Sequence, residues 1–393
     1  KDIGIVMAKG VIFGVLSTII ILPSLLMRFD KYIEKWKHPI ILKEPKKLPA
    51  FLTKHYKGIL VIFLVLFIPM GYAQNHTKVY YDLSANMPQD FASIIGTNKL
   101  KDQFHMTTTH FLLVDENLEN YQIKEICDEV EKLNGVYSVV SYESLIGGRI
   151  PTQLEPEAVK TILNNGGKKM ILVNSTYRAA TDEENEQLDK IDNIMHKYDK
   201  HAVIAGEGSL TRDLITTTDI DFKMVNILSV LAIFLIIVIT FKSLALPVIL
   251  VASIEFAICI NMGIPYFTGS VLPFIASIVI GTIQLGATVD YAILMTTRYK
   301  EELSNGKPVI EAAREAAAKS APSIITSGLS FFAACIGVSF IAKMDLIKSL
   351  CTLISRGAVI SMLVILLVLP ALLIIFHKAI EKTTKGWPKA NLK

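Results

Sequence analysis

The stretch Ser277–Arg298, SIVIGTIQLGATVDYAILMTTR, is a long apolar run that carries one carboxylate, Asp290, with Tyr291 directly after it. An apolar run of about 20 residues is long enough to cross the hydrocarbon core of a bilayer as a helix. A carboxylate at the centre of such a helix costs about 2.5–3.5 kcal/mol on insertion scales, so acids there are rare and mark functional sites. The stretch therefore predicts a membrane helix that carries a functional acid.

Similar apolar runs recur along the 393 residues, of which 51% are hydrophobic, and they predict seven membrane segments. These cover residues 3–27, 58–75, 222–241, 245–264, 271–297, 321–342 and 350–376. Lys and Arg are concentrated in the loops 28–57 and 298–320 and in the tail 378–393, and none lies in the link 265–270. Basic residues favour the cytoplasmic side of a membrane. We therefore expect a cell-membrane protein whose residues 76–221 lie outside the cytoplasm.

The polar region 76–221 contains two similar β-α-β patterns. The first has strands at 109–115 and 136–141 and an amphipathic helix at 122–133, which Gly135 ends. The second has strands at 169–177 and 202–205 and a helix at 182–198. A looser helical insert lies between the glycine pairs at 147–148 and 166–167. The pattern predicts a ferredoxin-like α+β sandwich attached to an α-helical membrane protein.

The first and last apolar segments share a sequence pattern. KGVIFGVLSTIIILPSLL at Lys9–Leu26 and RGAVISMLVILLVLPALL at Arg356–Leu373 both place a basic residue and Gly before Leu-Pro-small-Leu-Leu, at identical spacing. An internal repeat of this kind predicts two related halves. We therefore expect residues 1–27 to be the last helix of a first half and the remainder to form a second half.

Asp290 is the first candidate site residue. Burial favours the neutral carboxyl group, so this acid could exchange protons near neutral pH, and the phenol of Tyr291 could hydrogen-bond to it. The alternative is an acid paired with a basic group only for assembly. Glu255 is a second acid in mid-membrane and would either share the proton path or face an aqueous cavity. Ser327 and Ser330 are the expected hydroxyl partners of Asp290.

Two basic residues also lie within apolar segments. Lys9 and Arg356 could pair with Asp290 or Glu255, or could extend their charged ends to the membrane surface. The second interpretation is the better one for long side chains near a helix end.

Small and polar residues lie on the same helix face as Asp290. Gly286 is one turn before the acid and Thr297 two turns after it, a pattern typical of a helix packed inside a bundle. Further along, Ile310–Lys319 is Ala-rich with alternating charge. This segment predicts either a surface helix that couples two spans or a solvated linker helix.

Several protein classes have no support in the sequence. The chain has no phosphate-binding Gly-Lys-Ser/Thr loop and no Gly-x-Ser-x-Gly motif. Its four cysteines lie far apart, which argues against a disulfide framework or a metal site. An intramembrane aspartyl protease needs two aspartates, and Asp290 is the only Asp in mid-membrane. We expect no enzyme, cofactor or metal, and juxtamembrane lysines that contact membrane lipids rather than nucleic acid.

The chain resembles the MMPL branch of the resistance-nodulation-division (RND) superfamily. The resemblance rests on Asp290-Tyr291 followed by Arg298 and Glu301-Glu302, on the repeated Leu-Pro-small-Leu-Leu helix ends, and on SIEFAICINMGIPYFTG at Ser253–Gly269. It implies two halves, each with six helices and one extracytoplasmic porter domain. It also implies that an Asp-Tyr pair from each half faces the other as a proton relay.

The resemblance implies the second half of a proton-driven exporter of lipids or other hydrophobic compounds. The expected domains are a last helix of the first half at 1–27, a basic linker at 28–57, a helix at 58–75, a porter domain at 76–221, a five-helix bundle at 222–377 and a tail at 378–393. The expected partners are membrane lipids, an amphiphilic substrate and the missing N-terminal half. Whether a second copy of the chain joins them is left open by the sequence. The alternative is a sterol-sensing-like regulator that binds lipid on the same fold.

Overall fold

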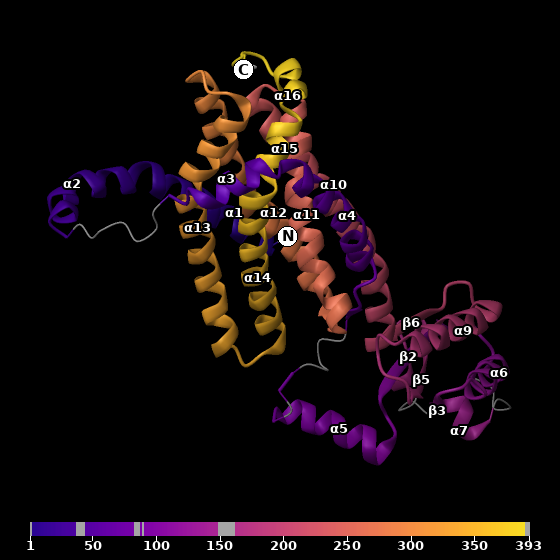
Figure 1. The fold of residues 1–393 in the computed structure, drawn as a ribbon. Coiled ribbons are helices and arrows are strands. Elements are labelled where there is room, and N and C mark those ends of the chain that lie inside the picture. The colour runs from indigo at the N-terminus through magenta and orange to yellow at the C-terminus, as the bar shows by residue number, and fades with distance from the viewer. Residues whose placement is uncertain (1, 37–43, 82–86, 89, 148–161, 390–393) are drawn as a thin grey trace. The chain divides into compact units, whose positions relative to one another are not determined.

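The computed structural model describes residues 2–36, 44–81, 87–88, 90–147 and 162–389 (Figure 1). The chain divides into two compact units, Lys1–Glu44 and Pro45–Lys393. The first contains α1 (Asp2–Leu16), a π-helical turn η1 (Ser17–Ile21) and α2 (Leu22–Lys35). The π turn ends at Ile21, two residues before Pro23, which lacks a backbone N–H and therefore disturbs the regular helical hydrogen bonds there.

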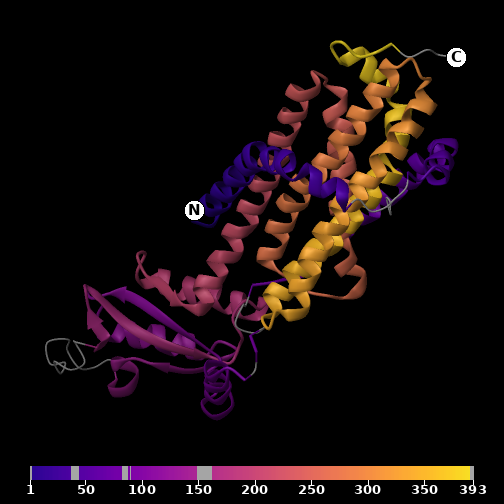
Figure 2. The same cartoon turned by 90° about the vertical axis from the view of Figure 1, so that its left-hand side faces the viewer.

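Long helices dominate the second unit (Figures 1 and 2). They are α4 (Tyr56–Asn75), α10 (Glu207–Phe241), α11 (Ala245–Thr268), α12 (Phe274–Ser304), α13 (Val309–Ile341) and α14 (Asp345–Leu367), which α15 (Leu369–Ile375) continues. Together with the helix at Gly4–Lys35, seven helical segments of the described chain are long and apolar enough to cross a membrane. The chain is therefore a multi-pass membrane protein, as the apolar runs predicted.

The helices extend beyond the apolar runs, because polar residues at their ends continue the same helical backbone. The expectation of a separate surface or linker helix at 310–319 was wrong. This segment forms the first turns of α13. Ala is the best helix former and is small enough for close packing. Ala312, Ala313, Ala316 and Ala317 are accordingly buried in the main apolar core.

Short elements connect the ends of the long helices. At one end, α3 (Lys47–Lys54) and α16 (His377–Thr383) contact the bundle. At the other end, β1 (Val79–Tyr80) pairs in parallel with β7 (Leu272–Pro273). The hydroxyl of Thr77 also donates to the Met262 carbonyl at 2.9 Å. These bonds fix the end of α4 to α11 and to the start of α12.

The α+β region follows α5 (Ala92–Phe104). Its elements are β2 (Thr108–Asp115), α6 (Asn120–Glu131), β3 (Val136–Val140), α7 (Tyr142–Ile146), β4 (Asn164–Asn165), β5 (Lys168–Ser175), α9 (Asp182–Tyr198) and β6 (Val203–Gly206). The sheet has the order β3-β5-β2-β6 with antiparallel pairs, and β4 adds to β5. Leu112, Ile123, Ile171 and Ile191 are fully buried between sheet and helices. Residues 148–161 of the expected helical insert lie outside the described residues.

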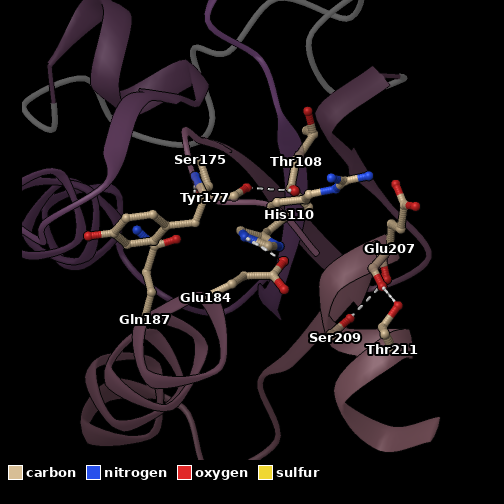
Figure 3. A network of polar contacts seen from close by, with 12 residues as sticks. Thr108, His110, Ser175, Tyr177, Glu184, Gln187, Glu207, Ser209 and Thr211 are labelled. Atoms are coloured by element: carbon tan, nitrogen blue, oxygen red, sulfur yellow. Dashed lines mark hydrogen bonds and ion pairs between the residues drawn. The ribbon is translucent and has the colours of Figure 1, made fainter. Parts of the chain in front are cut away.

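A buried polar pair lies where this region joins α10 (Figure 3). His110 from β2 and Glu184 from α9 are both fully buried, with Nε2 and Oε1 3.8 Å apart. Gly208 lies in the first turn of α10, and a Cβ there would contact the Glu184 carboxylate and come within 2.7 Å of the His110 ring. The close approach of α10 to this pair therefore requires glycine.

Burial lowers the pKa of His110 to about 4, because the buried site disfavours the charged imidazolium. The Glu184 carboxylate acts in the opposite direction, but at 3.8 Å it accepts no hydrogen bond from the ring, so burial dominates. An unfolded chain protonates histidine near pH 6.5. Between these two pKa values the unfolded state binds a proton that the folded state does not bind. The free energy of unfolding should therefore decrease by on the order of 3 kcal/mol as the pH is lowered from about 6.5 to about 4.

Hydrogen exchange of the β2 and β5 amides in the full chain, corrected for the intrinsic effect of pH, measures this loss. His110→Gln should remove most of the pH dependence, since glutamine does not titrate. His201→Gln is the matched control, because His201 is exposed and should keep the wild-type pH dependence. Equal pH dependence in the wild type and His110→Gln would contradict the assignment.

Candidate functional site

Asp290 lies in the middle of α12 with its side chain exposed on the surface of the bundle. Gly286 and Thr297, on the same face, are exposed as well. Their small and polar character predicted a helix packed inside a bundle, but within the described part of the chain no element covers this face. The structure also gives Asp290 no hydrogen bond or ion pair among the described residues. The carboxylate is therefore available to a group outside them.

Tyr291, the next residue, points into the bundle and is 7% exposed. Its hydroxyl accepts a long hydrogen bond of 3.5 Å from the hydroxyl of Ser327 on α13. Ser330 instead donates to the carbonyl of Thr326 in its own helix at 2.7 Å. Of the two predicted serines, the structure brings Ser327 to the Asp-Tyr pair through Tyr291 and leaves Ser330 bonded to its own backbone.

A glycine follows Ser327 directly and faces α14. A Cβ on Gly328 would lie 2.9 Å from the sulfur of Met362, so glycine lets α13 pack closely on α14. On its inner side, Tyr291 borders a small cavity of about 10 Å³ that Gln284, Thr288 and Ser361 also line. The phenol therefore lies between the exposed face that carries Asp290 and a small, mainly apolar cavity inside the bundle.

Glu255, on α11, is half-buried. Its Oε1 atom is buried and has no hydrogen-bond partner within the described residues. The structure shows no bond between Glu255 and Asp290 in that part of the chain. Its next neighbour, Phe256, packs against Phe63 and Phe67 of α4 at ring distances of 4.8 and 5.8 Å. A shared proton path for the two acids stays a prediction.

Arg356, on α14, bonds to an amide rather than to either acid. Its Nε donates to Oδ1 of Asn261 at 2.8 Å, and its terminal nitrogen donates to the Asn261 carbonyl at 2.6 Å. Lys9, in the N-terminal unit, lies 5.9 Å from the Phe13 ring centroid. The predicted pairing of Arg356 with Asp290 or Glu255 is therefore not found in the described residues, and Arg356 bonds to Asn261 instead.

The Asn261 side chain continues this network across three helices. Its Nδ2 donates to Oε1 of Gln284 on α12 at 2.8 Å, and Nε2 of Gln284 donates to Ser361 on α14 at 2.9 Å. Gly357 leaves the room for both amides, since a Cβ there would lie 2.7 Å from Asn261 Nδ2. The sequence analysis missed this network, although amides within apolar runs are a recognisable signal for interhelical hydrogen bonds.

The residues that the structure describes contain no cluster of His, Cys, Asp and Glu that could hold a metal ion. The protonatable groups at the site are the Asp290 carboxyl and the Tyr291 phenol. An exposed carboxylate, a neighbouring phenol and a serine hydroxyl can bind, orient and release a proton, provided that a second surface shields them from lipid.

Comparison with known proteins agrees with these features. A profile of the MMPL family matches residues 88–391. Membrane protein YdgH of Bacillus subtilis (strain 168) is 26% identical over 341 residues, which are 85% of this chain and 36% of YdgH. Heme uptake protein MmpL11 of Mycobacterium tuberculosis (strain ATCC 25618 / H37Rv) is 24% identical over 181 residues, which are 46% of this chain and 19% of MmpL11.

Membrane protein ActII-3 of Streptomyces coelicolor is 28% identical over 162 residues, 40% of this chain and 22% of that protein. The chain therefore spans about a fifth to a third of the length of these relatives. The family match includes Asp290 and the α+β region. This chain belongs to the MMPL family, whose proteins are of the RND type.

Proposed function

We propose that the chain is part of a proton-coupled exporter of lipids or other amphiphilic compounds, with Asp290 and Tyr291 as one side of its proton relay. The observation that carries this proposal is the position of Asp290. An acid in the middle of an apolar helix lies on an exposed face of the bundle, beside a phenol that contacts Ser327. Against lipid, such a carboxylate would cost about 2.5–3.5 kcal/mol, so a polar partner surface is expected to cover it.

The partner is a second helix bundle in this proposal. The repeat of Lys9–Leu26 in Arg356–Leu373 supports a related first half as that bundle, and a second copy of the chain is the other possibility. On α13, Ser323, Thr326 and Ser330 are exposed as well. Hydroxyls of this kind suit contacts between helices within a membrane.

The coupling step would begin when a proton neutralises Asp290 and changes its contacts with the partner bundle. The Asn261–Gln284–Ser361 bonds would carry a shift of α12 to α11 and α14. α10 runs without interruption from Glu207, beside the α+β region, to Phe241 in the bundle. A helix shift in the bundle could therefore move the α+β region.

The α+β region would act as the porter domain outside the cytoplasm. Its β-α-β-β-α-β order of β2, α6, β3, β5, α9 and β6 supports the proposed ferredoxin-like sandwich. The relative MmpL11 of Mycobacterium tuberculosis is a heme uptake protein by name, which favours transport over catalysis for this chain as well. We propose amphiphiles as the substrate class.

An imposed proton gradient tests the function. Proteoliposomes that contain the chain with its partner bundle should move a fluorescent phospholipid analogue only while the inside and outside differ in pH. A protonophore should stop the movement without releasing bound lipid. Transport that continues at full rate after the gradient is lost would overturn proton coupling. Binding of a sterol or lipid with no movement under either condition would favour the sterol-sensing-like regulator.

A further inference from the structure

A cavity of about 350 Å³ lies at the end of the bundle where α4 ends and α10 enters. This volume falls within the range of about 300–1,000 Å³ that is usual for ligand pockets. The polar residues of its lining come from the end of α4, from the residues just after it, and from α10 and α12. They are Gln74, Asn75, Thr77, Thr218 and Ser277.

Apolar and aromatic side chains line the same cavity. Phe222 of α10, Met262 of α11 and Phe274 of α12 contribute to it. The ring of Tyr81 stacks on Phe274 with a centroid distance of 5.2 Å. A cavity lined by both polar and apolar groups suits an amphiphile, whose two ends need different surroundings.

A smaller void continues this cavity into the bundle. It has a volume of about 10 Å³ and shares Gln74, Phe222, Met262 and Ser277 with the larger cavity. Val225 and Ile258 add apolar side chains to its lining, Asn226 and Thr282 add polar ones, and Gly281 adds a position without a side chain. The shared residues place the void next to the larger cavity. A volume of about 10 Å³ holds about one water molecule, so the alkyl chain of a ligand lies in the larger cavity.

The charge of the residues that line the cavity indicates which headgroup the ligand carries. Among the described lining residues, Lys223 of α10 is the one that carries a formal charge, and its side chain is exposed. The remaining polar lining groups are neutral amides and hydroxyls, which can donate hydrogen bonds to anionic oxygens. A lysine ammonium group is a point charge suited to phosphate.

We propose that this cavity binds a single-chain or double-chain amphiphile with an anionic headgroup, and that Lys223 selects the headgroup charge. The alkyl chain lies along Phe222, Met262 and Phe274, and the headgroup contacts Lys223 and the amides of Gln74 and Asn75. The proposal names the substrate class of the exporter proposed above and rests on that function.

Equilibrium binding of radiolabelled dodecyl phosphate to the full chain in phosphatidylcholine nanodiscs tests the proposal. Counts from protein-free nanodiscs are subtracted. Lys223→Gln should weaken binding about fivefold, the effect of one partly solvated ion pair, and Lys223→Arg should keep it. Ser277→Phe should abolish binding by filling the cavity. Lys78→Gln is the matched control, because Lys78 is exposed at the same end of the bundle and does not line the cavity.

Competition identifies which part of the probe is recognised. Unlabelled dodecyl phosphate should displace the label, whereas dodecyltrimethylammonium and inorganic phosphate should not. Displacement by inorganic phosphate at the same concentration would show that a free anion suffices and would overturn an amphiphile site. Equal loss in Lys78→Gln and Lys223→Gln, or unchanged binding in Ser277→Phe, would also overturn the proposal. Because no gradient is present, normal binding by Asp290→Asn together with lost transport separates this site from the coupling mechanism.

Discussion

Replacing Asp290 with Asn should reduce proton-driven transport by about 100-fold or more, because an amide can neither take up nor release a proton. The variant should insert into the membrane at least as well as the wild type. A neutral amide in an apolar helix avoids the charge that costs about 2.5–3.5 kcal/mol. Transport is measured in the gradient-dependent phospholipid assay, and insertion by the amount of monodisperse protein extracted from membranes.

Two further substitutions distinguish a proton site from a structural one. Asp290→Glu should restore part of the transport, since it keeps a protonatable group near the same position. Glu301→Gln is the matched control: Glu301 is an exposed acid of the same helix, paired with Arg298 at 2.8 Å, and its loss should leave transport nearly unchanged. Undiminished transport by Asp290→Asn would remove the relay from the proposed function. Equal losses from Asp290→Asn and Glu301→Gln would point to net charge instead.

The number of membrane helices was predictable from the sequence, because a bilayer of fixed thickness demands apolar runs of nearly fixed length. The ends of the helices were less predictable. Glu207 and Val309 begin α10 and α13 well before the apolar residues, since polar residues at a helix end continue the same backbone hydrogen bonds. Apolar runs report where lipid lies, whereas helix ends depend on local propensity and packing.

The candidate site was predictable to different degrees for different residues. Asp290 could be identified from the sequence because a charged side chain within an apolar helix raises the free energy of membrane insertion, so such acids are rare. The exposure of the Asp290 side chain could not be predicted. The same stripe of small residues fits a helix face that is covered by its own chain and one that is covered by another bundle. Ser327 and Ser330 look equivalent in the sequence. The packing of α13 against α12 decides which of them meets Tyr291.

Hydrogen-bond partners that lie on three different helices are harder still to predict from the sequence. Arg356 was expected either to pair with an acid or to extend to the membrane surface. Its actual acceptor is Asn261, which lies far away in the sequence on α11. The choice depends on where two helices cross, and no local pattern around Arg356 encodes that crossing. The mutual contacts of Asn261, Gln284 and Ser361 depend on it in the same way.

Replacing Asn261 with Leu should therefore destabilise the bundle strongly. Asn261 is fully buried, and its side chain bonds Gln284, the Leu353 carbonyl and Arg356. Leucine has a similar size but leaves Nε of Arg356 and Oε1 of Gln284 without these partners. Hydrogen bonds between membrane helices contribute about 0.6 kcal/mol each on average. The half-buried guanidinium of Arg356 keeps its bond to the backbone carbonyl of residue 261 but loses the side-chain acceptor, which adds to the loss. We expect a total loss of about 2–3 kcal/mol, which corresponds to a fall in Tm on the order of 5 °C.

The fraction of monodisperse protein that remains after heating in a fixed neutral detergent measures this Tm. The double variant Asn261→Leu with Arg356→Leu decides how Arg356 contributes. If Arg356 is held by Asn261, the double variant should be more stable than Asn261→Leu alone, because removal of both partners leaves no stranded charge. If Arg356 instead extends freely to the membrane surface, its removal should restore nothing. Ser361→Ala is the milder control, since Gln284 keeps its bond to Asn261 when this one acceptor is lost.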